Sequence, residues 1–336
     1  MLKRELTVMC QADTAVDVNS VTKIFTQWQR ENAGRELLKN LLKPQKKMIH
    51  ALDDVSFTVG RGEFVAYAGP NGAGKSTTMK LLAGMLQPTE GSISVLGLSP
   101  EKDRIHLMSK LGVLFGNRTE LWWDHPVSQS FEWKKVVWDI PSDVYKRNLD
   151  RVIDLLDIGD LMKTFARELS LGQRMRADLA MMLLHSPDLI LLDEPTLGLD
   201  VVAKRQMIEF LKKMNRENGV TIIVTSHDMD DLEEMAKRVF MVAGGKIVYD
   251  GCFDGLRDIT GNLTRLTITT EGVVPELEHG RLIKNEKSVF EFEVDLAKTP
   301  IKSLLKRLSE TEGIKDVEIK KAPIEQVIAE LYKKWR

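Results

Sequence analysis

Short, almost wholly apolar runs alternate with helical patterns through the middle of the chain. Residues 189–192 (Leu-Ile-Leu-Leu) and 220–224 (Val-Thr-Ile-Ile-Val) have little or no polar face. Such runs are typical of strands buried on both faces of a parallel sheet. From about residue 53 to 255, strand and helix patterns alternate. The pattern therefore predicts an α/β domain whose sheet is covered by helices.

Different patterns appear at the two ends of this region. Residues 15–19 alternate as a first strand would, and Gly244-Gly245 joins two short apolar runs as a terminal hairpin would. Beyond about residue 260, clean alternation at 266–269 and 289–294 is followed by helical spacing over about 301–312 and 323–335. We therefore expect a main domain at 1–258 and a small α+β domain at 259–336.

A basic segment interrupts the first strands. Residues 26–47 carry leucines on one helical stripe, and six basic residues against two acidic ones lie between 30 and 47. The spacing predicts an amphipathic basic helical insertion. A solvated surface helix and a helix facing anionic lipid or a membrane subunit both fit this pattern.

Composition excludes several classes of protein. The 336 residues are 43% hydrophobic and 29% charged, with a net charge of −1. Such a near-neutral chain does not attract nucleic acid by bulk charge, so we expect no nucleic-acid partner. Cys10 and Cys252 lie far apart and form no metal-ligand cluster, which favours a reduced, cytosolic setting. No apolar stretch approaches the length of a membrane span.

A glycine-rich loop carries the clearest chemistry. Residues 69–77 read GPNGAGKST, between a predicted strand at 63–68 and a predicted helix from Ser76. Glycines let the backbone aim its N–H groups at phosphate, and the helix N-terminus adds partial positive charge. Lys75 would reach the β- and γ-phosphates and Ser76 would bind Mg²⁺. The expected phosphate-binding residues are Gly69, Pro70, Asn71, Gly72, Ala73, Gly74, Lys75, Ser76 and Thr77.

Two adjacent carboxylates end an apolar strand downstream. Residues 189–195 read LILLDEP, and successive strand side chains point to opposite faces, so the two acids can serve different roles. Asp193 would hold Mg²⁺, and Glu194 would polarise the water that attacks the γ-phosphate. A Mg²⁺-dependent phosphoryl transfer from a nucleotide is therefore expected, with Lys75 and Glu194 as catalytic groups.

Residues 169–173 read LSLGQ before a helix, and this run resembles the LSGGQ signature of the ABC ATPases, with Leu171 replacing the first glycine. The resemblance covers about residues 15–255. It implies a P-loop ABC cassette, with a mixed sheet core and a helical subdomain at 117–178. It also implies a head-to-tail dimer in which Ser170, Gly172 and Gln173 of one chain reach the ATP of the other.

Other segments follow in the order of that family. The resemblance implies that Asp200, in Leu-Gly-Leu-Asp, communicates across the dimer, and that His227 is the switch histidine that binds the γ-phosphate. It also implies an adenine-stacking aromatic near the first strand, for which Phe25 is the candidate and Trp28 the competitor.

A second position, in addition to Leu171, departs from the family pattern. A metal-contacting glutamine is expected after the strand at 111–115, where this sequence has Gly116-Asn117. Asn117 is the best substitute, although strict counting places Gly116 there and leaves the role vacant. The adjacent Trp122 and Trp123 fit either burial under the helical subdomain or a dock for a membrane subunit.

The function implied is the ATPase subunit of an exporter-type ABC transporter. It would work as a homodimer, or paired with a homologous subunit, beneath a separate membrane permease at the cytoplasmic face of the membrane. The alternative is a soluble ABC ATPase of translation or DNA maintenance, although the chain has one cassette and no long coiled coil. A nucleotide-binding module that hydrolyses ATP negligibly, because of Asn117, is a third possibility.

Overall fold

The computed structural model describes residues 14–28, 46–116, 119–259, 263–271, 277, 280–296, 299–321 and 331. The chain forms two compact units, Met1–Asp250 and Gly251–Arg336. The boundary therefore lies before helix α10 (Phe253–Asp258) and not after residue 258 as the sequence pattern predicted.

A six-stranded sheet forms the centre of the first unit, in the order β5-β6-β7-β3-β8-β9. The pairs β5–β6, β6–β7, β7–β3 and β3–β8 are parallel. Every residue of β3, β6 and β7 is buried, which confirms the apolar runs as two-sided core strands. The strands are β3 (Phe64–Ala68), β5 (Leu111–Phe115), β6 (Leu189–Asp193), β7 (Thr221–Thr225), β8 (Arg238–Ala243) and β9 (Lys246–Gly251).

The expected terminal hairpin is present. Gly244 and Gly245, between β8 and β9, have φ values of 56° and 79°. A two-residue turn with positive φ at both positions matches the right-handed twist of the flanking strands, and glycine adopts it without steric cost.

An antiparallel sheet in the order β2-β1-β4 packs beside the first sheet. Its strands are β1 (Thr14–Trp28), β2 (Lys46–Gly60) and β4 (Glu90–Val95). The β1–β2 ladder continues through Thr26↔Met48 to Trp28↔Lys46. The two ends of the expected helical insertion at 26–47 are therefore strand, because the ladder pairs their backbone groups. Residues 29–45 lie outside the described part of the chain.

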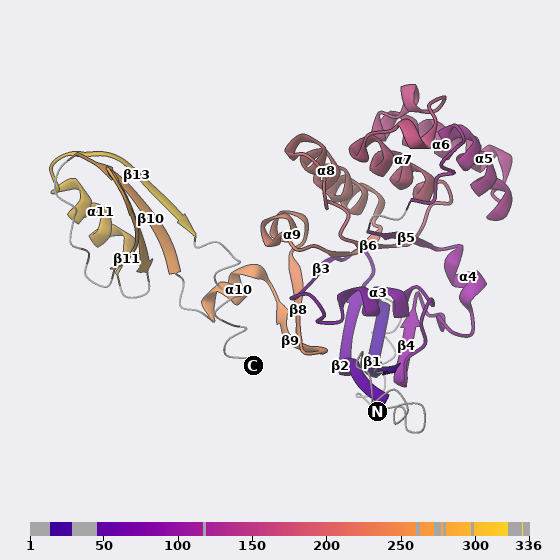
Figure 1. The fold of residues 1–336 in the computed structure, drawn as a ribbon, viewed down its shortest axis with the longest axis horizontal. Coiled ribbons are helices and arrows are strands. Elements are labelled where there is room, and N and C mark those ends of the chain that lie inside the picture. Colours follow the sequence, from indigo (N-terminus) through magenta and orange to yellow (C-terminus); the bar gives the residue numbers. More distant parts are fainter. Residues whose placement is uncertain are drawn as a thin grey trace, which may run out of the picture. The chain divides into compact units, whose positions relative to one another are not determined.

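Helices α5, α6 and α7 follow β5, lead back to β6, and gather together in the first unit (Figure 1). The sequence predicts a helical subdomain over 117–178, and α7 continues past the end of that range to Leu183. The helices of this unit are α3 (Lys75–Leu82), α4 (Arg104–Met108), α5 (Val127–Val137), α6 (Ser142–Leu156), α7 (Leu171–Leu183), α8 (Val201–Asn218) and α9 (Met229–Met235), with 3₁₀ turns at Gly159–Leu161 and Ala166–Glu168.

The second unit is a small α+β domain, as expected. Its antiparallel sheet has the order β11-β12-β10-β13, and α11 (Ile301–Ser309) packs Leu304 and Leu308 onto the apolar residues of that sheet. The expected helix over 323–335 lies almost wholly outside the described residues. The strands are β10 (Leu263–Thr270), β11 (Gly280–Glu286), β12 (Val289–Asp295) and β13 (Ile314–Lys321).

Among the helices that the structure describes, none combines the length and apolarity needed to cross a membrane.

Candidate functional site

The segments with predicted chemistry meet at one edge of the six-stranded sheet. Asp193 at the end of β6 is in register with Phe115 at the end of β5 and with Thr225 at the end of β7. The glycine-rich loop follows β3, which runs parallel to β7. Because carboxyl ends of parallel strands share an edge, the loops after β3, β5, β6 and β7 all emerge there, where α/β proteins bind ligands.

The glycine-rich loop wraps tightly into the start of α3. Gly72 and Gly74 have φ values of 79° and 109°. A Cβ on Gly74 would lie 2.5 Å from the Ala51 carbonyl oxygen, and a Cβ on Gly69 would collide with the Val242 carbonyl oxygen. Only glycine fits these two positions, so the backbone here can face a ligand directly. The loop, with helix N–H groups behind it, fits a phosphate.

Lys75 is folded back over this loop. Its Nζ donates to the Gly69 carbonyl oxygen at 2.6 Å and to the Pro70 carbonyl oxygen at 3.3 Å, and the residue is only 5% exposed. Burial lowers the pKa of Lys75, an effect that the negative charges of Glu194 and Asp193 oppose. The amino group therefore lies between the loop and the acidic strand end, where a polyphosphate would need a cation.

The Asp193 carboxylate is buried and already oriented. Its Oδ1 accepts a hydrogen bond of 2.6 Å from the Thr225 hydroxyl. No group of three or more His, Cys, Asp or Glu side chains able to hold a metal occurs among the described residues. One carboxylate with the half-buried Ser76 hydroxyl suits Mg²⁺, which keeps most of its ligands as water and substrate phosphate oxygens.

Glu194 and His227 face each other across two strand ends. Glu194 Oε1 and His227 Nε2 lie 2.7 Å apart, which is a hydrogen-bond distance. Glu194 has φ of 59°, a left-handed conformation that is uncommon for non-glycine residues, and its backbone N–H bonds to the oxygens of Thr225. The strained backbone turns the carboxylate toward the histidine, and such strain clusters at functional sites.

The signature segment forms a helix cap. The Ser170 hydroxyl accepts from the Gln173 N–H, and the Gln173 side chain accepts from the Ser170 N–H, which is a capping box at the start of α7. Leu171, which replaces the first glycine of the family signature, lies against Gly198, where an added Cβ would come within 2.9 Å of the Leu171 Cδ2. Gly172 in turn approaches Ala203 on α8. The α7 start is therefore packed against the Asp200 segment.

Asp200 caps α8 through a 2.8 Å hydrogen bond to the Ala203 N–H. The two residues after it, Val201 and Val202, are 82% and 67% exposed. Exposed β-branched residues beside a capped helix start form an apolar surface that a partner chain could cover.

The aromatic candidates are partly exposed. Phe25 is 37% exposed, and the Lys23 amino group lies 5.3 Å from its ring centroid. The side chain of its competitor Trp28 lies outside the described residues, as does Asn117. Trp122 and Trp123 remain 38% and 49% exposed, so neither is fully buried under the helical subdomain.

Sequence reasoning missed a buried carboxylate next to the Asn117 loop. Asp178 on α7 accepts hydrogen bonds from the Thr119 hydroxyl at 2.9 Å and from the Glu120 N–H at 3.1 Å. Burial raises its pKa to about 6, against these two hydrogen bonds. An acid within an amphipathic helix is an ordinary surface residue by its pattern, so no sequence signal marked it.

The raised pKa of Asp178 predicts that the folding stability falls as the pH rises. Its folded pKa lies above the unfolded value, so its contribution to stability is fully present below about pH 4 and is lost as the pH rises through about 6. Asp178→Asn keeps an acceptor and removes the charge. Urea unfolding should show the variant gaining roughly 2 kcal/mol on the wild type between pH 4.5 and 8, since one pKa unit is about 1.4 kcal/mol and part of the loss has already occurred by pH 4.5. Equal pH slopes for wild type, Asp178→Asn and the exposed control Asp154→Asn would contradict this.

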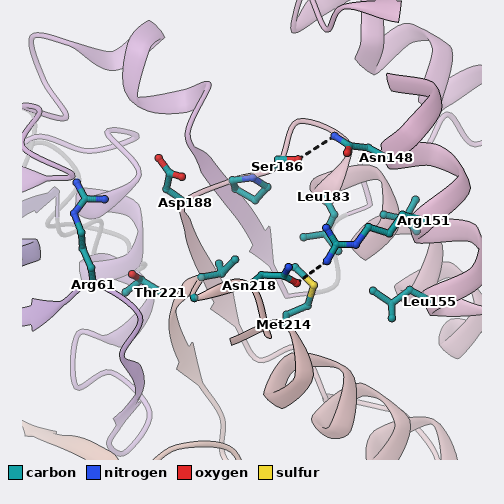
Figure 2. Close-up of a pocket in the computed structure, with 14 residues that line it drawn as sticks. Arg61, Asn148, Arg151, Leu155, Leu183, Ser186, Asp188, Met214, Asn218 and Thr221 are labelled. Atoms are coloured by element: carbon teal, nitrogen blue, oxygen red, sulfur yellow. Dashed lines mark hydrogen bonds between the residues drawn. The ribbon is translucent and has the colours of Figure 1, made fainter. Parts of the chain in front are cut away.

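Two cavities lie at opposite ends of the parallel strands, and only one of them adjoins the candidate site. A cavity of about 200 Å³ is lined by Glu194, His227 and residues 197–199, which precede Asp200. A cavity of about 350 Å³ lies where β6 and β7 begin, between α6 and the end of α8, where Arg151 Nη2 donates to Asn218 Oδ1 at 2.7 Å (Figure 2). That is the opposite end of the strands from the glycine-rich loop, so this cavity is not part of the phosphate site.

The phosphate loop and the acidic strand end define a P-loop nucleotide-binding protein. The family model described as ABC transporter matches residues 52–197. The chain is 32% identical over 212 residues to the ABC transporter ATP-binding protein NatA of Bacillus subtilis, a match that spans 63% of this chain and 86% of that protein.

Further relatives differ in their named roles. The probable multidrug ABC transporter ATP-binding protein YbhF of Escherichia coli is 35% identical, over 68% of this chain and 39% of that protein. The methionine import ATP-binding protein MetN 2 of Rhodococcus jostii is 34% identical, over 60% and 61%. The solved structure of cbiO1 from Clostridium perfringens, part of an ABC transporter complex, aligns with a TM-score of 0.58 at 26% identity, over 74% and 95%.

The chain belongs to the ABC transporter ATP-binding proteins. It is an ATPase subunit of a transport system, and the relatives support this function over the soluble non-transport alternative. Its relatives include proteins named for import, so membership of the family does not by itself assign the direction of transport.

Proposed function

We propose that the chain hydrolyses Mg-ATP in a head-to-tail dimer and thereby drives a separate membrane permease. The observation that carries the proposal is the 2.7 Å approach of Glu194 Oε1 to His227 Nε2 beside the glycine-rich loop. A carboxylate held at a histidine, next to a buried lysine, provides a base and two cationic or donor groups around the position of a γ-phosphate.

In this proposal each group has a separate role. Glu194 polarises the attacking water, while His227 and Lys75 bind the γ-phosphate. Ser76 and Asp193, with Asn117 as the third candidate, hold Mg²⁺, which would neutralise charge on the phosphate oxygens. The remaining loop residues 69–77 cradle the phosphates, and Phe25 stacks on adenine.

The dimer rests on two surface features. Ser170, Gly172 and Gln173 form a capped helix start, which is a second anion-binding end of a helix. The exposed Val201 and Val202 follow Asp200 on a surface suited to burial. The cbiO1 protein is part of an ABC transporter complex, and by analogy we assign this chain a membrane permease partner and a peripheral place at the cytoplasmic membrane face.

The steady-state rate tests this function. The ATPase rate per chain should rise with protein concentration, because each site needs two chains, and EDTA should abolish it. A concentration-independent rate would contradict the dimer, and an EDTA-insensitive rate would contradict the metal. No hydrolysis at any concentration would favour a binding-only module.

We also propose that the system exports its substrate. The support is the resemblance of the sequence to exporter-type systems, drawn from the 26–47 insertion, the Trp122–Trp123 pair and the C-terminal domain together. Both tryptophans are partly exposed, at 38% and 49%, and so are accessible to a membrane subunit. Inside-out vesicles carrying the chain and its permease should accumulate substrate when ATP is added outside. ATP-dependent loss of preloaded substrate would indicate import.

Asn117→Gln should raise turnover severalfold, because the longer amide would reach Mg²⁺ and the attacking water. The measurement is kcat for Mg-ATP in the variant and the wild type. A fall in kcat would mean that Asn117 does not occupy the metal-contacting position.

A further inference from the structure

A lysine on α8 bridges two carboxylates behind the Glu194–His227 pair. Lys204 Nζ lies 2.7 Å from Asp228 Oδ2 and 3.0 Å from Asp231 Oδ2. Asp228 directly follows His227, and Lys204 lies one helical turn after Asp200. One side chain therefore connects the start of α8 to the loop that carries the histidine.

The two carboxylates hold further parts of the site. Asp231 Oδ2 also accepts from the Thr196 hydroxyl at 3.0 Å, and Thr196 lies two residues beyond Glu194. Asp228 Oδ1 accepts from the Asp231 N–H and so caps α9. The loops after β6 and β7 and the start of α8 thus share one hydrogen-bonded network.

The network is sensitive to loss of its cation. Asp231 and Thr196 are 6% and 4% exposed, and Lys204 is the cation placed between the two acids. Burial lowers the pKa of Lys204, but its bonds to Asp228 and Asp231 outweigh burial and the pKa is raised. Asp231 is buried, whereas the Lys204 and Asp228 side chains are 27% and 43% exposed. Removing the lysine leaves two carboxylates facing each other, one of them buried, which favours separation of the segments that carry them.

We propose that Lys204 is a positioning residue that sets the distance between His227 and Glu194 and couples it to the placement of Asp200. This inference rests on the proposed ATP hydrolysis. The cavity of about 200 Å³ has Glu194, His227 and Lys204 in its lining, so a shift of α8 changes the shape of the space beside the reacting groups. A partner chain that contacts the Asp200 segment would thereby act on the histidine.

The primary test is Lys204→Met, which keeps the length of the side chain and removes its charge. The expected kcat falls about thirty-fold, because a small misplacement of a catalytic group can cost on the order of a hundred-fold. The KM for Mg-ATP should change far less than kcat, since the phosphate loop is untouched and His227 supplies only one contact to the γ-phosphate. Lys204→Arg, which can still bridge the two carboxylates, restores most of the rate.

The matched control is Lys212→Met on the same helix. Lys212 also links α8 to α9, through Glu234 at 3.9 Å, but this pair is exposed and lies away from His227. Its kcat should equal that of the wild type. An equal loss in both lysine variants would mean that general α8–α9 attachment matters and would overturn the positioning role.

If Lys204→Met does not fold, Asp231→Asn decides the question. It keeps an acceptor for Thr196 and removes one charge from the bridge, so kcat should fall while ATP still raises the melting temperature. A wild-type kcat in Asp231→Asn overturns the proposal, as does a wild-type kcat in Lys204→Met. Absence of ATPase activity in the wild type would instead contradict the proposed function itself.

Discussion

Lys75→Met should abolish ATP-dependent stabilisation and reduce hydrolysis at least about a hundred-fold, the usual cost of removing one preorganised charge stabiliser. In the wild type Lys75 Nζ bonds to two loop carbonyl oxygens, and these bonds hold the ammonium where the phosphates would sit. Methionine fills the same space without charge. The folded chain should therefore persist, because mainly hydrogen bonds to backbone carbonyls are lost.

Thermal unfolding with and without Mg-ATP measures this effect. ATP at about a hundred times its dissociation constant stabilises the wild type by about 2.7 kcal/mol, and the variant should show almost none of this. Lys80→Met is the matched control, because Lys80 is an exposed residue of the same helix. An unchanged ATP-induced shift in Lys75→Met would mean that the loop binds no phosphate.

Glu194→Gln should reduce kcat by about a hundred-fold or more while leaving ATP binding intact, because a general base contributes on that scale. Glutamine retains the shape of the side chain and a hydrogen-bonding group toward His227, yet it cannot accept the proton from water. With hydrolysis blocked, the ATP-bound dimer should accumulate.

Size-exclusion chromatography with light scattering, run with and without Mg-ATP, detects that dimer. The control is Glu209→Gln, since Glu209 is an exposed residue of α8 that pairs only with Lys212 among the described residues. A monomer in Mg-ATP for Glu194→Gln would contradict the head-to-tail arrangement. Undiminished hydrolysis would show that another group activates the water.

The sequence predicted the α/β unit because its strands are marked by composition. A run such as 189–192 is apolar on both faces, and only burial between helices satisfies it. The glycines of the 69–77 loop also predicted its conformation, because positive φ values such as those of Gly72 and Gly74 favour glycine over other residues. These elements could therefore be predicted from neighbouring residues alone, without knowledge of long-range contacts.

The sequence did not predict in the same way which strands pair or where the two units divide. The basic spacing of 26–47 suggested a helix throughout, whereas its ends extend the β1–β2 ladder, because cross-strand hydrogen bonds outweigh local propensity. The domain boundary likewise moved, to Asp250–Gly251, since contacts rather than sequence pattern assign α10 to the second unit.

By itself the amino-acid sequence determined the phosphate loop, the acidic strand end and the order of the motifs, all of which depend on neighbours along the chain. Only the tertiary structure decided that Glu194 meets His227, that Lys204 joins Asp228 to Asp231, and that Asp178 is buried. These contacts depend on parallel strands aligning distant residues at one sheet edge and on helices packing over them. Such through-space distances have no counterpart in residue order.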